Sequence, residues 1–211
     1  ISNFPLLLYT YNNGLIIGMN AMFNRNLTPN NTKKINLLKI YAEESGLVTG
    51  ALLYNQTKEG KTLADLFRFF KMDIEFKHII SHNKSSLHLR AYAGAGLALT
   101  TGSKKGEVTL PFFKSFIAGG PNSMRGWAIR KLGIGSNVFY DTVAAGTFSD
   151  KYADMQLEGN IEYRFNLFQF YGFWMRGAAF TDIGNIWFRN DLNNTLKNAG
   201  FRLDRLGKDI A

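Results

Sequence analysis

The stretch MQLEGNIEYRF, Met155 to Phe165, decides the fold of this chain of 211 residues. Its odd-numbered positions from 157 carry Leu157, Gly159, Ile161, Tyr163 and Phe165, whereas its even-numbered positions carry Gln156, Glu158, Asn160, Glu162 and Arg164. A period of two is typical of a β-strand, because successive side chains point to opposite faces of a sheet. The stretch therefore predicts a strand with one apolar face and one fully polar face.

The same alternation extends upstream of this strand. It occurs over Phe70 to Lys77 and over Leu87 to Leu97, and the polar SHNKS segment, Ser81 to Ser85, predicts a turn between them. Further expected strands are Asn3 to Tyr11, Leu15 to Asn24, Lys33 to Glu43, Leu47 to Thr57, a segment following Arg130, and Gly172 to Trp187. The sequence thus predicts about nine strands, all antiparallel and mostly joined by short turns.

Strand length separates two kinds of all-β protein. Strands of a sandwich usually have about five or six residues, whereas transmembrane strands need about 9 to 11 and lie between aromatic girdles. Several expected strands here reach that length, and aromatic residues lie near their ends: Phe69, Phe70, Phe165, Phe168, Tyr171, Phe173, Trp174 and Trp187. We therefore expect residues 1–211 to form part of an antiparallel transmembrane β-barrel in an outer membrane, with the bilayer as a partner.

The net charge of +9 raises the possibility of a nucleic-acid partner. The basic residues, however, never run longer than a pair, as in Lys33-Lys34, Lys104-Lys105 and Arg130-Lys131. Scattered cations are typical of a solvated surface or a polar lumen, so we expect no nucleic-acid partner.

The three histidines do not predict a metal site. His78 and His82 have the i, i+4 spacing of zinc ligands on a helix, but their segment is expected to be a strand and no glutamate stands between them. Alignment of the apolar faces of neighbouring strands places His78 and His88 on opposite faces. The chain also has no cysteine to ligate a metal.

Gly94 and Gly96 begin a GxG pattern, but Leu99 occupies the position of the third glycine in a dinucleotide fingerprint. Glycines within a strand instead indicate curvature or the close approach of another segment. The sequence also lacks a GxSxG nucleophile elbow and a P-loop. We therefore expect no cofactor and no enzymatic activity.

A long connection from Thr100 to about Leu132 contains the stretch GGPNSMRGW, Gly119 to Trp127; a second one covers Asp141 to Ala153. If the first folds into the barrel, Arg125 needs a carboxylate partner, because an unpaired charge in a confined space is costly. Glu162 and Asp182, on the polar faces of two later strands, are the candidates for a bidentate, charge-assisted contact. An outward loop would leave Arg125 solvated.

Three motifs in order, GGPNSMRGW, LEGNIEYRF and GAAFTDIGNIW, resemble the C-terminal barrel of the bacterial surface-antigen superfamily, the BamA/TamA-type assembly proteins. The resemblance covers Phe70 to Ala211 and is greatest to the TamA-like branch of Bacteroidota. It implies that the loop folds inward and that Arg125 contacts Glu162 and Asp182. It assigns the loop motif to Gly119, Gly120, Asn122, Ser123, Arg125, Gly126 and Trp127, with Gly126 allowing a tight tip and Trp127 replacing the more common Phe or Tyr.

The resemblance also implies a sixteen-stranded barrel in a Gram-negative outer membrane, whose last two strands would follow Ala211. Periplasmic POTRA repeats would precede this chain, which contains none, and accessory lipoproteins would be partners. The implied function is insertion or translocation of client outer-membrane or surface proteins. A two-partner-type secretion pore or a passive channel is the alternative, since an Arg-carboxylate cluster can also simply hold a plug loop.

Overall fold

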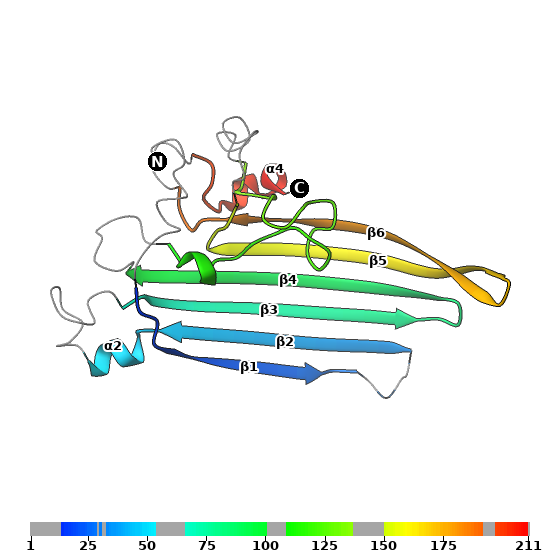
Figure 1. Ribbon diagram of the computed structural model, residues 1–211, viewed down its shortest axis with the longest axis horizontal. Helices are drawn as coiled ribbons and strands as arrows, with labels where there is room; N and C mark the ends of the chain where they lie inside the picture. Colours follow the sequence, from blue (N-terminus) through cyan, green and yellow to red (C-terminus); the bar gives the residue numbers. More distant parts are fainter. Residues whose placement is uncertain are drawn as a thin grey trace.

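The computed structural model describes residues 14–28, 30, 33–53, 66–100, 109–136, 150–191 and 197–210. These residues form one antiparallel sheet of six strands that follow one another in sequence order (Figure 1). The strands are β1 (Gly18–Asn26), β2 (Lys34–Ser45), β3 (Arg68–Ser81), β4 (Ser85–Thr100), β5 (Met155–Phe170) and β6 (Phe173–Trp187). The prediction of an all-β, antiparallel fold with long strands is confirmed.

The strand register keeps the polar and apolar rows apart. Arg90 of β4 pairs with Asn160 of β5, which pairs with Asp182 of β6, so the three lie in one row on the polar face. The neighbouring row, Leu89 to Ile161 to Thr181, lies on the other face. The alternation in β5 therefore extends across the sheet.

The apolar face remains open to its surroundings. Phe70, Met72, Ile74 and Ile161 on this face are between 36% and 53% exposed. Soluble proteins rarely expose a contiguous apolar surface of this kind, whereas a lipid-facing sheet requires one. No helix among the described residues has the length and apolar character needed to cross a bilayer.

The expected strand over residues 47–57 is wrong within its described part, residues 47–53. Val48–Leu52 of the expected strand over residues 47–57 is the short helix α2. The chain turns at Gly46, whose φ of +65° favours glycine, and the Leu47 amide donates to Glu44 Oε2 at 3.0 Å. The expected strand over residues 3–11 lies outside the described residues.

The described residues after Arg130 are not a strand, and the rest of that expected segment, from residue 137, lies outside the described residues. Residues 131–136 form only one bridge, between Leu132 and Ala118, and no strand. Gly133 and Gly135 have φ values of +110° and +52°, which bend the chain twice within three residues. An extended pattern of side chains cannot form a strand on such a backbone.

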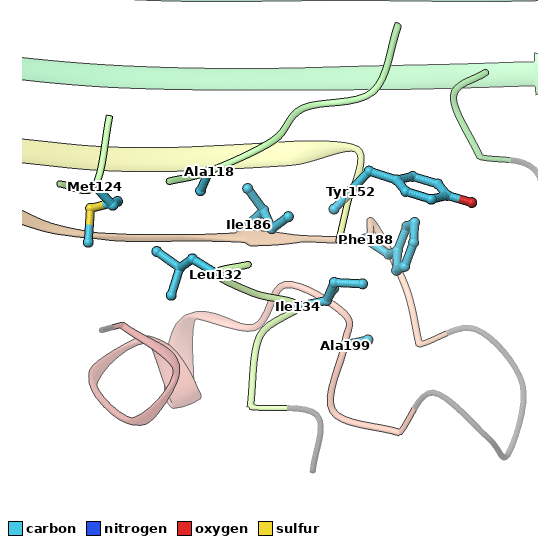
Figure 2. Packing of buried hydrophobic residues seen from close by; sticks show 9 residues of the cluster. Ala118, Met124, Leu132, Ile134, Tyr152, Ile186, Phe188 and Ala199 are labelled. Carbon is cyan, nitrogen blue, oxygen red and sulfur yellow. The ribbon is translucent and has the colours of Figure 1, made fainter. Parts of the chain in front are cut away.

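The connection between β4 and β5 crosses the sheet instead of projecting away from it, and we call its described residues 109–136 the inward loop (Figure 1). The short helix η2 (Phe112–Lys114) lies near its start. Figure 2 shows side chains of residues 118–134 of this loop packed against the end of β6 and the segment that follows, which includes η3 (Leu203–Arg205) and α4 (Leu206–Asp209). The buried cluster comprises Ala118, Met124, Leu132, Ile134, Tyr152, Ala153, Ile186, Phe188 and Ala199. This cluster anchors the middle and the end of the inward loop, whereas its beginning, with Leu110 and Phe116, packs in a second buried cluster.

Candidate functional site

Arg125, near the tip of the inward loop, lies against the polar face of β5 and β6. Its Nε and Nη2 donate to the two carboxylate oxygens of Asp182, at 2.8 and 2.7 Å, and its backbone amide donates to Asp182 Oδ2 at 3.0 Å. Its Nη1 donates to Glu162. The structure thus brings together all three residues of the predicted contact, here called the Arg125 cluster: Arg125, Glu162 and Asp182.

The Arg125 cluster is partly shielded from solvent. The side chain of Asp182 is 5% exposed and that of Arg125 is 21% exposed. The guanidinium also lies over the ring of Phe180, 3.8 Å from its centroid, in a cation–π contact. Hydrogen bonding to Asp182 raises the pKa of Arg125 above its ordinary value, so the residue stays charged.

A second contact fixes the loop at Ser123, two residues before Arg125. Ser123 Oγ donates to Glu158, whose fully buried carboxylate also accepts from Arg90 Nη1 at 2.7 Å and from Gln156 Nε2 at 2.7 Å. The Ser123 carbonyl accepts from Asn160 Nδ2 at 2.8 Å. Glu158 and Asn160, which are neighbours on the polar face of β5, therefore bind the loop tip at Ser123 in addition to the contacts of Arg125, and Asn160 also donates to Asp182 at 2.9 Å.

The sequence placed Ser123 in the loop motif but did not identify Glu158 and Asn160 as its partners, or Arg90 as the cation that binds both of them. Their only signal is the polar alternation in β4 and β5, which several other side chains share. The pairing of Arg90 with Asn160 and the position of the loop above them single these residues out. Neither the strand pairing nor the position of the loop can be predicted without the tertiary fold.

The glycines at the start of the motif, Gly119 and Gly120, have backbone conformations that favour glycine, whereas Gly126, which the resemblance singled out, does not. Gly119 and Gly120 have φ values of +105° and +88°, and a Cβ on Gly119 would lie 2.2 Å from the carbonyl oxygen of Ala128. Gly126 has no such φ, and a Cβ there would meet nothing within 4 Å. A tight turn does lie at Arg125 and Gly126, where the Trp127 amide donates to the Met124 carbonyl at 3.1 Å, but neither the φ of Gly126 nor the space around it requires a glycine there.

The other two motif residues make little contact through their side chains. Trp127 is 45% exposed, and its backbone carbonyl accepts from the Gly120 amide at 2.8 Å to close the turn. Asn122 is exposed and, with Pro121, borders a hollow of about 420 Å³ between the loop tip and the sheet. The aromatic residue of the motif is thus not part of the Arg125 cluster.

Gly94 and Gly96 of β4 allow the inward loop to approach the sheet. A Cβ on Gly94 would lie 2.3 Å from the ring of Phe116, and one on Gly96 would lie 2.2 Å from Leu110. Both loop side chains are buried, at 3% and 1% exposure. The interpretation of these glycines as a site of close approach is confirmed.

Charged and polar groups also hold the root of the loop. Lys114 Nζ binds Glu43 Oε1 at 2.5 Å, and the Leu110 amide donates to Asp154 Oδ1 at 2.8 Å. Asp154 is 3% exposed, and burial raises its pKa to about 6. The inward loop is therefore tethered at its root, at Ser123 and at Arg125.

The histidines are separated as expected. His78 pairs with Leu89 in the strand register and its ring bonds to Asn36, whereas His88 pairs with Glu162 on the polar face. No group of three side chains suited to a metal ion occurs in the described parts of the chain. The polar face instead offers alternating cations and carboxylates that bind a protein loop.

Comparison with known families agrees with this arrangement. The model of the Omp85 superfamily domain matches residues 49–204, which include β3 to β6 and the inward loop. A search of curated protein sequences gives no significant match. Members of the superfamily are outer-membrane proteins of Gram-negative bacteria with roles in the assembly or translocation of outer-membrane proteins. With the family model covering most of its length, this chain belongs to the Omp85 superfamily.

Proposed function

We propose that the chain is part of a sixteen-stranded outer-membrane barrel that inserts or translocates client outer-membrane or surface proteins, as a TamA-like member of its superfamily. Its substrates are unfolded polypeptides, and no covalent step or cofactor is required. POTRA domains of the full-length protein and accessory lipoproteins are the proposed partners on the periplasmic side.

The observation that carries the proposal is the attachment of the inward loop to the polar face. Arg125 binds Glu162 on β5 and Asp182 on β6. Ser123 binds Glu158, which also lies on β5. A loop held at these points keeps β5 and β6 in fixed register from the inside. The part of the barrel wall that contains β5 and β6 is thereby stiffened while the seam opens.

The proposed mechanism uses backbone pairing at that seam. An edge strand has unpaired N–H and C=O groups, which a client strand can satisfy by adding to the sheet. In lipid these groups have no water to bind, so pairing with the barrel edge lowers the barrier to insertion of the client. The Arg125 cluster contributes by bracing the barrel and does not touch the client.

The proposal is tested by replacing the full-length protein in its host with an Arg125→Gln variant and measuring the outer-membrane proteome. Exposed Arg202 supplies a matched control, Arg202→Gln, with the same change in charge. Parallel depletion of the full-length protein gives the complete loss of function. We expect many unrelated barrels to fall together on depletion and in Arg125→Gln, and none in the control. Loss of a single exported protein would instead indicate a dedicated secretion pore.

A further inference from the structure

A basic hollow lies on the polar face of the sheet, beside the turns that join β3 to β4 and β5 to β6. Its volume is about 460 Å³, and the cations in its lining are Lys84 of the first turn, Arg164 of β5 and Arg176 of β6. Arg164 lies two residues after Glu162 in β5. Arg176 lies six residues before Asp182 in β6. Even separations along a strand place side chains on one face, so both arginines share the face of the Arg125 cluster, which lines the lumen of the proposed barrel.

The hollow lies at the mouth of the lumen that faces the periplasm. Outer-membrane barrels have short periplasmic turns and longer extracellular loops. Here β3 and β4 are joined by residues 82–84 and β5 and β6 by residues 171–172, whereas the connection that contains the inward loop spans residues 101–154. Figure 1 shows both short turns at the end of the sheet opposite to the end at which β4 stops and β5 starts. A polypeptide that enters the lumen from the periplasm therefore passes the hollow before it reaches the Arg125 cluster.

The positive charge of the hollow is not balanced by the described residues. None of the carboxylates that the structure describes occurs in its lining. Arg164 binds Glu162, but Glu162 also binds Arg125. Within the described part of the chain, Lys84 and Arg176 have no ion-pair partner. The hollow therefore attracts an anion.

Cations elsewhere on the lumenal side are paired. Arg90 binds Glu75 and Glu158, and Lys114 of the inward loop binds Glu43. The hollow at the periplasmic mouth departs from this pattern, and a ligand can supply the carboxylates that the sheet does not.

The size of the hollow and its surroundings favour an unfolded polypeptide over a free ion. A water molecule occupies about 30 Å³ of the liquid, so the hollow has room for roughly fifteen waters, far more than one phosphate ion fills. Ser85, Ser86 and Asn166 in the lining can bond to the N–H and C=O groups of a backbone. Trp174, which is 60% exposed, lies on the same face of β6 as Arg176 and offers an apolar contact two residues away. An extended segment with acidic and apolar side chains satisfies all three features.

We propose that Lys84, Arg164 and Arg176 bind an acidic segment of a client polypeptide as the client enters the lumen from the periplasm. The inference rests on the proposed function, since it concerns the same clients, and it adds an electrostatic contact inside the lumen to their passage. Two guanidinium groups and one ammonium group orient the client carboxylates by charge-assisted hydrogen bonds. All three cations are exposed, so each ion pair is weak and the client can leave the hollow again.

The test measures the binding of synthetic peptides to the full-length protein in phosphatidylcholine nanodiscs, which leave both mouths of the lumen open. The probe is a short fluorescein-labelled peptide in which glutamate alternates with alanine, and its control has glutamine in place of each glutamate. Fluorescence anisotropy gives the two dissociation constants. We expect the glutamate peptide to bind about tenfold more tightly, because three exposed ion pairs each contribute a factor of about two. Equal binding of the two peptides overturns the proposal.

Charge removal then identifies the site. The variant Lys84→Gln/Arg164→Gln/Arg176→Gln is expected to bind the glutamate peptide about tenfold more weakly than the parent protein does. A control variant with the same net charge should keep the affinity of the parent protein. It neutralises three exposed cations near the other end of β6: Arg189→Gln, Arg202→Gln and Lys208→Gln. Equal losses in the two variants would assign the binding to net charge alone and overturn the proposal.

Charge reversal covers the case in which the triple variant misfolds. Because Lys84 and Arg176 have no ion-pair partner among the described residues, Lys84→Glu/Arg176→Glu breaks no ion pair of the described sheet. This variant should lose the glutamate peptide and bind a peptide with lysine in place of each glutamate. Failure to exchange the two peptides overturns the proposal. Displacement of the glutamate peptide by inorganic phosphate more readily than by chloride at equal ionic strength assigns the hollow to free phosphate and also overturns it.

The peptide assay and the proteome experiment can fail separately. Client assembly is not part of the peptide assay, and Arg125→Gln changes no residue in the lining of the hollow. If the glutamate peptide does not bind although many barrels fall in Arg125→Gln, only the electrostatic contact is wrong. If the peptide binds although no barrel falls, the hollow binds acidic segments but the proposed function fails, and the client fails with it as the ligand.

Discussion

Arg125 and Asp182 are joined by three hydrogen bonds, two from the guanidinium and one from the Arg125 backbone amide. The carboxylate therefore orients both the side chain and the main chain of the loop tip. A lysine at this position could keep the charge and one contact, but not the planar two-point geometry. This pair sets the position of the inward loop on β6.

Removal of this pair is expected to release the loop tip. In a double-mutant cycle, Arg125→Gln and Asp182→Asn should show a coupling of about 2 kcal/mol in the free energy of unfolding, because both groups are partly desolvated and share one interaction. Urea titration of the protein in lipid vesicles measures it. The control cycle, Arg202→Gln with Asp204→Asn, concerns an exposed pair 3.7 Å apart and should give a coupling near zero. Equal coupling in the two cycles would contradict a special role for Arg125.

Ser123→Ala is expected to loosen the tip without unfolding the sheet. The variant loses the hydroxyl that donates to Glu158 and accepts from the Gly119 amide at 3.1 Å, at a cost of about 1 kcal/mol, while Arg90 and Gln156 still satisfy the carboxylate. A spin label at exposed Asn122 should report greater mobility. Ser115→Ala is the matched control, since Ser115 Oγ bonds only to carbonyls of the loop root. An unchanged spectrum in Ser123→Ala would assign the tip's order to Arg125 and to the bond from Asn160 to the Ser123 carbonyl, which the variant keeps.

Gly94→Ala is expected to force the loop root away from β4. The added Cβ would lie 2.3 Å from the Phe116 ring, which is buried and has little room to move. Overpacking of this kind costs about 1–3 kcal/mol, which urea unfolding can measure. Gly159→Ala, on the apolar face, is the control: its Cβ would meet only the flexible Ile183 side chain at 3.2 Å. Equal losses in the two variants would indicate a general strand effect.

Particular residues show how much of the fold and of the site could be predicted from the sequence. The alternation around Glu162 and the repeat of that pattern in other strands are local, so the strands, their polar face and the candidate partners of Arg125 were predictable. Helix α2 was not, because Gly46 redirects a chain whose side chains still fit a strand. The Ser123–Glu158 contact was not either, since it depends on how far the loop reaches across the sheet. That Gly119 and Gly120, and not Gly126, have the positive φ values that favour glycine was not predictable, because a motif does not reveal φ.

Asp154 makes the stability of the loop root depend on pH. In the unfolded chain the Asp154 carboxyl ionises near pH 3.8, whereas in the folded chain burial raises its pKa to about 6 and keeps it protonated below that pH. Between these values the folded state binds more protons, so the contribution of Asp154 to the free energy of unfolding falls as pH rises and stays low above pH 6. Asp154→Asn lacks this titration. As the pH rises from 3.8 to about 6, the free energy of unfolding of the variant should therefore increase relative to that of the parent protein, by about 3 kcal/mol at most. Parallel stability curves for the two proteins would contradict the assignment.

Asp73 and Ile74 are neighbours in β3 that point to opposite faces, and they allow the membrane placement to be tested at one depth. Ile74 is 39% exposed on the apolar face, whereas Asp73 pairs with Tyr41 and Gly94 on the polar face. We expect a spin label at position 74 of the full-length protein in lipid vesicles to collide with oxygen, which concentrates in lipid. A label at position 73 should instead collide with a water-soluble nickel chelate. The same contrast is expected for Phe70, Met72, Leu89, Leu157 and Ile161 against their polar neighbours. If labels at positions 73 and 74 reported water equally, the apolar face would not be in contact with the bilayer, and the barrel assignment would fail with it.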